Sequence, residues 1–179
     1  MATEPEGRWL ASPTGKLTRV IHINDSAIRI LLVYGGHANG RTDQLRMAVE
    51  AGVRSIGAGL TLQVSRALDC GVDDLLAAHG VLLGTPEHFG YMSGALKDFF
   101  DRTFYPCEGK TVGMPYALVV SAGNDGSGTV RAVERIVTGY GWTSFAAPLV
   151  VVGVPDSDAI ARAHELGATL AAGLVAGIF

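Results

Sequence analysis

The sequence predicts an α/β fold, built as a doubly wound parallel sheet of five strands with helices on both faces. Short runs of β-branched and other apolar residues alternate along the chain with longer segments that have helical periodicity. The short runs are almost continuously apolar, which is typical of parallel strands covered on both faces. With 179 residues, 48% of them hydrophobic and 17% charged, the chain is long enough for one domain with a sizeable core. We expect this domain to span residues 28–179, after an N-terminal extension of residues 1–27.

The extension lacks helical periodicity and contains several glycines and prolines. Val20–Ile23 could form a short strand. Two interpretations stay open. The extension is disordered or loosely docked, which we favour for residues 1–15, or it is an arm that packs on a neighbouring subunit through Trp9 and Leu10.

Strands and helices are predicted in alternation through the rest of the chain. The strands are expected at Ile28–Val33, Thr61–Val64, Val81–Gly84, Tyr116–Ser121 and Leu149–Val152. The helices are expected over residues 45–56, 73–78, 92–103, 130–140 and 160–178, where apolar residues recur every three or four positions. Acidic residues favour two of the helix starts, those near Asp73 and Asp156. Tyr105–Lys110 is expected to be a connection.

The stretch after the third strand contains unusual side chains for a connection. The apolar run breaks at Gly84, and the loop Thr85–Gly90 follows. This loop, the second of three candidate loops in chain order, contains an imidazole and the flat ring of Phe89. In open α/β sheets, ligands bind beyond the carboxyl ends of the strands. The second loop is therefore a candidate seat for a flat heterocycle.

This stretch also resembles a known family. Gly84-Thr85-Pro86, Phe89–Gly94, Lys97 and Phe99–Arg102 are similar to the isoalloxazine loop and following helix of flavodoxin-like FMN proteins, in particular the NAD(P)H-dependent FMN or quinone reductases. The resemblance implies a flavodoxin-like fold with strand order 2-1-3-4-5. It also implies a noncovalent FMN, NAD(P)H as electron donor and a small acceptor such as a quinone or free flavin. With that strand order, the loops after the first, third and fourth strands meet at one edge of the sheet.

The first loop, Tyr34–Thr42, leads directly into a predicted helix. Backbone N–H groups at a helix start point at one spot and bind phosphate well. In the resembling family this loop binds the FMN 5′-phosphate, usually with several Ser or Thr hydroxyls, whereas Gly36 and Ala38 stand in those places here. We expect Arg41 and Thr42, both at an exposed helix start, to help the backbone amides. The candidate residues are Gly36, His37, Asn39, Gly40, Arg41 and Thr42.

Two other interpretations of the first loop stay open. One is a plain strand-to-helix turn, in which Asn and Gly are common. The other is a nucleotide-binding P-loop, because Gly35 to Thr42 reads G-x-x-x-x-G-R-T. Arg41 replaces the P-loop lysine, and no later strand ends in an Asp that would hold the metal.

The second and third loops supply the remaining candidates for cofactor binding. In the second loop these are Thr85, Pro86, Glu87, His88, Phe89 and Gly90, and in the third loop, Ser121–Gly128, they are Ser121, Ala122, Gly123, Asp125 and Gly126. Phe89 is expected to pack beside the flavin. His88 and Glu87 either contact the flavin edge or substrate or are solvated loop residues. The glycines of the third loop allow close backbone approach to a ring, and the positive end of the following helix could stabilise charge on a reduced flavin.

Composition narrows the function further. The net charge of −3 and pI near 5.9 argue against nucleic acid as a partner. We find no triad signature, no H-E-x-x-H and no metal-ligand spacing, so we assign no catalytic residue and no metal, and the flavin would carry the chemistry. Cys70 and Cys107 are expected to be reduced thiols. No run approaches a membrane span and Glu4 and Glu6 are unlike a signal peptide, so we expect a cytoplasmic protein.

The assembly and the activity class complete the expectations. We expect a homodimer or homotetramer, with contact surfaces in the extension and around Tyr105-Pro106. The leading activity is that of a reductase. A flavodoxin-type electron carrier without its own substrate is the main alternative, and a sensing module that has lost its flavin is another.

Overall fold

The computed structural model describes residues 9–11, 17–22, 28–57 and 59–179, and of the first two segments it describes the backbone alone. The strands are β1 (Trp9–Ala11), β2 (Leu17–His22), β3 (Ile28–Tyr34), β4 (Leu60–Arg66), β5 (Gly80–His88), β6 (Tyr91–Met92), β7 (Pro115–Ala122), β8 (Thr143–Ser144) and β9 (Leu149–Val152). The helices are α1 (Arg41–Ser55), α2 (Val72–Leu76), α3 (Gly94–Cys107), α4 (Ser127–Tyr140) and α5 (Ser157–Val175). In these described parts, no helix has the length and apolarity needed to cross a bilayer.

The five predicted core strands form a parallel sheet in the expected order. β3 pairs with β4 on one side and β5 on the other, β5 pairs with β7, and β7 pairs with β9. Numbered as the five predicted strands, this order is 2-1-3-4-5, so the predicted α/β class is confirmed. The short strand β8 pairs with the start of β7 and precedes β9 at the same edge.

The sheet is wider than predicted, because the extension contributes two antiparallel strands. β2 pairs with β4, from Thr18↔Ser65 to His22↔Thr61, and β1 pairs with β2. The strand expected at Val20–Ile23 is thus present from Leu17 to His22, and Ile23 lies outside the described residues. The expectation of a loosely docked segment is wrong for residues 9–11, because they add hydrogen-bonded backbone to an edge that would otherwise be unpaired. The rest of residues 1–15 lies outside the described part.

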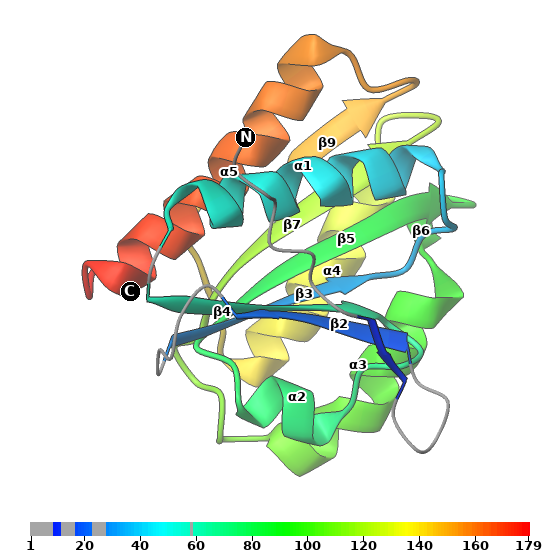
Figure 1. Ribbon diagram of the computed structural model, residues 1–179. Helices are drawn as coiled ribbons and strands as arrows, with labels where there is room; N and C mark the ends of the chain where they lie inside the picture. The colour runs from blue at the N-terminus through cyan, green and yellow to red at the C-terminus, as the bar shows by residue number, and fades with distance from the viewer. Residues whose placement is uncertain (1–8, 12–16, 23–27, 58) are drawn as a thin grey trace, which may run out of the picture.

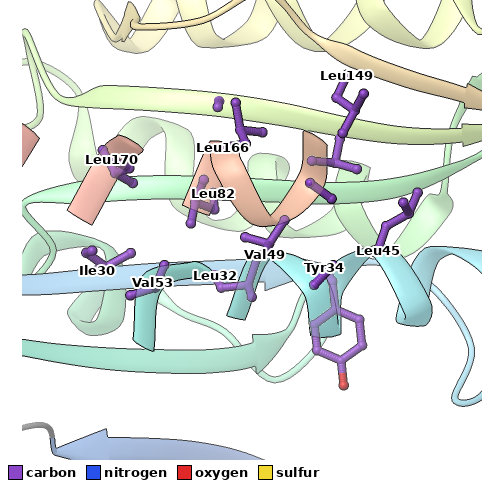
Figure 2. Packing of buried hydrophobic residues seen from close by; sticks show 14 of the residues in the cluster. Ile30, Leu32, Tyr34, Leu45, Val49, Val53, Leu82, Leu149, Leu166 and Leu170 are labelled. Carbon is purple, nitrogen blue, oxygen red and sulfur yellow. The ribbon is translucent and has the colours of Figure 1, made fainter. Parts of the chain in front are cut away.

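Helices cover both faces of the sheet (Figure 1). On one face, Ile30 and Leu32 of β3 belong to a core cluster with residues of α1 and α5, shown in Figure 2. On the other face, Leu31 and Val33 belong to a second cluster, with residues of α3 and α4 such as Phe99. Successive strand residues point to opposite faces, so the two buried clusters explain why the strand is apolar at every position.

Several element boundaries differ from the sequence-based expectations. β5 does not end at Gly84 but runs to His88, and Met92 belongs to β6 rather than to the following helix. α3 ends at Cys107, so Tyr105 and Pro106 lie in its last turn, although a proline usually breaks a helix interior. α5 ends at Val175, so Ile178, expected at the end of the last helix, lies beyond it and is exposed.

Candidate functional site

The three candidate loops meet at the carboxyl edge of the sheet, as expected from the strand order. β3, β5 and β7 are parallel neighbours, with pairs such as Tyr34↔Gly84 and Pro86↔Ser121 near their ends. The first loop, the second loop and the third loop therefore begin side by side (Figure 1). Every predicted cofactor-binding residue lies on one of these three connections, although the side chains have different surroundings.

The first loop is packed so closely that two of its glycines have no room for a side chain. A Cβ at Gly35 would lie 2.1 Å from Ser93 Oγ, and a Cβ at Gly36 would lie 2.7 Å from Thr42 Cβ. The Gly35 amide is bonded to Gly84 O at 2.8 Å, which fixes the loop to the next strand. Thr42 thus occupies the space next to Gly36, which explains why the hydroxyl residue of the resembling family is missing there.

Free backbone amides gather at the start of α1. The Asn39 amide donates to the Asp43 carboxylate at 3.0 Å and the Gly40 amide to His37 O at 3.2 Å. Among the described residues, no hydrogen-bond partner exists for the amides of Gly36, His37, Ala38, Arg41, Thr42 and Asp43. Such a group of free donors at a helix N-terminus fits a phosphate. The side chains of His37 and Arg41 are exposed beside it.

A pair of buried hydroxyls joins the first loop to the third. Thr42 Oγ1 lies 2.6 Å from Ser121 Oγ, and either can be the donor. The two residues are 4% and 7% exposed, so the expectation of an exposed helix start is right for Arg41 but wrong for Thr42. Two hydroxyls have two protons and their mutual bond uses one. The other proton has no acceptor among the described residues, and a phosphate oxygen would supply one.

The second loop is a tight hairpin rather than an open loop. β5 and β6 pair at Glu87↔Met92 and His88↔Tyr91, which leaves a two-residue turn of Phe89 and Gly90. Both turn residues have positive φ, 53° and 74°, as a two-residue hairpin of type I′ requires. Phe is uncommon at positive φ. The Phe89 side chain is fully exposed.

The base of this hairpin is closed by Thr85 and Ser93. The Ser93 amide donates to Thr85 Oγ1 at 3.0 Å, and Ser93 Oγ accepts from the Leu96 amide and so caps α3. Thr85 is completely buried, so its hydroxyl supports the hairpin, while Pro86 beside it is partly exposed. Ser93 was not among the predicted site residues, although a serine three residues before the first buried leucine of a helix is a signal of an N-cap.

The third loop begins inside β7 and ends at the start of α4. Ser121 and Ala122 are buried strand residues, and Gly123 and Asp125 are exposed. The Asp125 carboxylate accepts from the Ser127 amide at 3.0 Å, and hydrogen bonds from the Ser127 amide and hydroxyl lower the pKa of Asp125. The positive end of α4, expected to act on a flavin, is therefore partly offset by this carboxylate.

Two contacts join the hairpin to the third loop. The Asn124 amide donates to Glu87 Oε2 at 3.2 Å. A Cβ at Gly128 would lie 2.1 Å from Gly90 O, so the hairpin turn rests directly on the start of α4. The third loop also needs a glycine at position 126, because the φ of Gly126 is 68° and a Cβ there would lie 2.6 Å from Val150 Cγ1. Neither Asn124 nor Gly128 was among the predicted site residues.

Comparison with solved structures establishes the class of the fold. An archaeal flavodoxin superposes with a TM-score of 0.72 at 19% identity, over 83% of this chain and 99% of that one. A WrbA-like flavodoxin protein from Agrobacterium tumefaciens gives a TM-score of 0.63 at 18% identity, over 81% of this chain and 96% of that one. The protein thus has a flavodoxin-like fold.

Sequence comparison establishes the family. A family model described as NADPH-dependent FMN reductase matches residues 71–155. A protein of Acidithiobacillus ferrooxidans named NAD(P)H dehydrogenase (quinone) is 30% identical over 72% of this chain and 72% of its own length. A protein of the same name from Geobacter metallireducens is 29% identical over 58% of this chain, and the match covers only 53% of that relative. The chain belongs to the flavodoxin-like family of NAD(P)H-dependent FMN and quinone reductases.

Proposed function

We propose that the protein is an FMN-dependent oxidoreductase that takes electrons from NAD(P)H and passes them to a small acceptor such as a quinone or free flavin. Family membership supports the reaction class. The structural observation that carries the cofactor assignment is the group of free amides at the start of α1, beside a hydroxyl pair with one proton to donate. Their position at the switch point of the sheet is where this fold class binds ligands.

The residues present fit the phosphate end of FMN. The amides of the first loop would bind the phosphate oxygens, and the Thr42–Ser121 pair would donate one further hydrogen bond. Arg41 would add positive charge, and the exposed His37 and Asn39 lie next to this group. Gly36 and Gly40 complete the loop, with Gly36 making room for Thr42.

The second and third loops would hold the flavin ring. The exposed Phe89, His88 and Gly123 offer a flat surface, an imidazole and an unobstructed stretch of backbone. When bound, FMN would supply the hydride-accepting and electron-donating chemistry that no side chain here provides. The chain itself would bind and orient the ring, and no side chain is assigned as a nucleophile or base.

A flavodoxin-type electron carrier is the second candidate. A protein of Aquifex aeolicus named flavodoxin is 27% identical over 62% of this chain. The reductase family model and the quinone dehydrogenase relatives favour the reductase.

One experiment tests the cofactor and the activity class in sequence. The purified protein is incubated with excess FMN and desalted, and flavin absorbance and the thermal midpoint are measured. Stabilisation should grow with the logarithm of the FMN concentration. The loaded protein is then mixed anaerobically with NADH or NADPH. Rapid bleaching of the flavin is expected for a reductase. Flavin that never bleaches would contradict the reductase and favour the electron carrier.

We also infer a homodimer or homotetramer in a cytoplasmic setting. A groove of about 370 Å³ between α3 and α4 supports the assembly, because the 79% exposed Tyr105 and the ring of Phe104 line it. Cys70 and Cys107 are both buried and form no disulfide, which fits a reducing compartment. Light scattering on the full chain, with and without FMN, tests the assembly. A single species of monomer mass in both conditions would contradict it.

A further inference from the structure

The hairpin and the third loop separate at a defined point of the sheet. The β5–β7 ladder runs from Val81↔Tyr116 to Pro86↔Ser121 and then stops. Pro86 has no N–H to continue a ladder. Beyond it, β5 enters the hairpin while β7 turns into the third loop, so the backbone no longer connects these two parts of the site.

Glu87 is the first residue beyond the end of that ladder. Its carboxylate reaches the third loop and accepts from the Asn124 amide at 3.2 Å. Glu87 is half-buried, and its backbone is fixed by pairing with Met92 in the hairpin. The Glu87 side chain thus replaces the backbone hydrogen bonds of the ladder at the point where β5 and β7 separate.

A second contact lies at the far end of the hairpin. Gly90 O rests against Gly128, where even a methyl group would overlap. The third loop is therefore joined to the hairpin at two points, by Glu87 at the base and by Gly90 at the tip. The amide of Gly123, next to Asn124, has no partner among the described residues.

We propose that Glu87 is a positioning residue of the cofactor site, whose carboxylate fixes the third loop by accepting from the backbone of Asn124. This inference rests on the proposed function, because the loop is held for the flavin. A loop fixed before binding loses less conformational freedom when the ligand arrives. The role differs from the direct flavin or substrate contact first expected for Glu87, because the hydrogen bond goes to the protein.

The test uses Glu87→Ala and Glu87→Gln in the full chain. Glutamine keeps an acceptor oxygen and removes the charge, whereas alanine removes both. Solvent exchange of the Asn124 amide proton is measured by NMR without FMN, and the dissociation constant for FMN is measured by fluorescence quenching. Glu108→Ala is the matched control, because Glu108 is an exposed carboxylate with no side-chain partner among the described residues, at the far end of α3.

We expect Glu87→Ala to speed exchange at Asn124 and to weaken FMN by about fivefold, the effect of losing roughly one such hydrogen bond. Glu87→Gln should restore both values to within about twofold, and the control should change neither. Unchanged exchange in Glu87→Ala would overturn the proposal. FMN affinity lost equally in both variants, with exchange still slow in Glu87→Gln, would overturn it in favour of a charge effect. If the unmodified protein binds no FMN, the proposed function fails, and the exchange data still decide whether Glu87 fixes the loop.

Discussion

The first loop and the hairpin tip were both expected to contact one cofactor, but their physical surroundings are opposite. In the first loop, Gly35 and Gly36 are in contact with neighbouring side chains, and a methyl group would overlap at either. At the tip, Gly90 has open space around its Cβ position, and Phe89 is fully exposed at positive φ. Tight packing makes the first loop part of the protein's stability, whereas the exposed Phe89 side chain can change with little consequence for the fold.

This difference determines how each region can be tested. Substitutions at the packed positions of the first loop, such as Gly36 and Thr42, should change stability and FMN binding together, because these residues also pack against neighbouring side chains. Substitutions of Phe89 at the hairpin tip should change FMN binding without lowering stability. A variant that binds FMN poorly but unfolds normally would locate the cofactor at the tip more directly than any change in the first loop.

The largest effect is expected from Gly36→Ser, which adds the hydroxyl that the resembling family has in this loop. The new Cβ would lie 2.7 Å from Thr42 Cβ, so Thr42 must move away from Ser121. We expect the free energy of unfolding to fall by about 2 kcal/mol. FMN affinity should fall by about tenfold rather than improve, because the hydroxyl pair is broken. Urea unfolding and a fluorescence titration measure the two quantities.

Ala38→Ser is the matched control for Gly36→Ser. It adds the same hydroxyl two residues along the loop, at an exposed position. Stability should stay within about 0.5 kcal/mol, and FMN affinity should be unchanged or higher. If Gly36→Ser tightened FMN without loss of stability, the packing explanation for the missing hydroxyl would be wrong.

The next effect concerns the buried hydroxyl pair. Thr42→Val leaves Ser121 without its partner in a buried position, and Ser121→Ala does the same to Thr42. Each change should lower the free energy of unfolding by about 1–2 kcal/mol. The double variant should cost less than the sum, because an unpaired buried hydroxyl is the main penalty.

The same variants also test the spare proton of the pair. FMN should bind more weakly to each single variant than to the unmodified protein. If the single variants bound FMN normally despite their loss of stability, the pair would join α1 to β7 without contacting the phosphate.

The sequence was sufficient for the α/β class, because the signals behind it are local, whereas the strand order came from the family resemblance and the antiparallel pairing of the extension was not predicted. Continuous apolar strands such as Ile28–Val33 predict burial on both faces, and β3 has that burial. The second loop was harder to predict. Phe89 is an uncommon residue at the positive φ of a tight turn, so nothing in Thr85–Gly90 indicated a hairpin.

The candidate site, like the fold, was predictable from the sequence only in part. The convergence of the three loops followed from strand order, and the amides of the first loop from the helix start. The Thr42–Ser121 pair and the Glu87–Asn124 bond join residues far apart in the chain. Such partners depend on the distance between two elements after packing, which one sequence does not contain. Asp125 remains a predicted cofactor-binding residue, and the hydrogen bond from the Ser127 amide to its carboxylate was not predicted.

The hairpin tip should show the opposite behaviour from the first loop when Phe89 is replaced by glycine. Glycine adopts positive φ without the strain of a larger residue, so the free energy of unfolding should rise by up to about 1 kcal/mol. Loss of the ring should weaken FMN by about fivefold, roughly the value of one aromatic contact. Phe89→Asn, which also tolerates this φ, should behave like the glycine variant. Normal FMN affinity in both would place the ring away from Phe89.

The smallest effect is expected from Arg41→Ala, which removes charge from the first loop without touching its packing. Arg41 is exposed at the start of α1, and no ion pair is formed by it among the described residues. Stability should stay within about 0.5 kcal/mol. FMN affinity should fall by about threefold at low salt, since exposed charges contribute less than about 1 kcal/mol. The difference between variant and parent should disappear near 1 M salt, where the screening length is about 3 Å. Arg162→Ala is the control, because Arg162 is an exposed residue of α5 whose ion pair with Asp158 is also exposed, so FMN affinity should change in neither condition. A salt-independent loss in Arg41→Ala would mean that the arginine shapes the loop, and no loss at all would leave phosphate binding to the backbone amides and the hydroxyl pair.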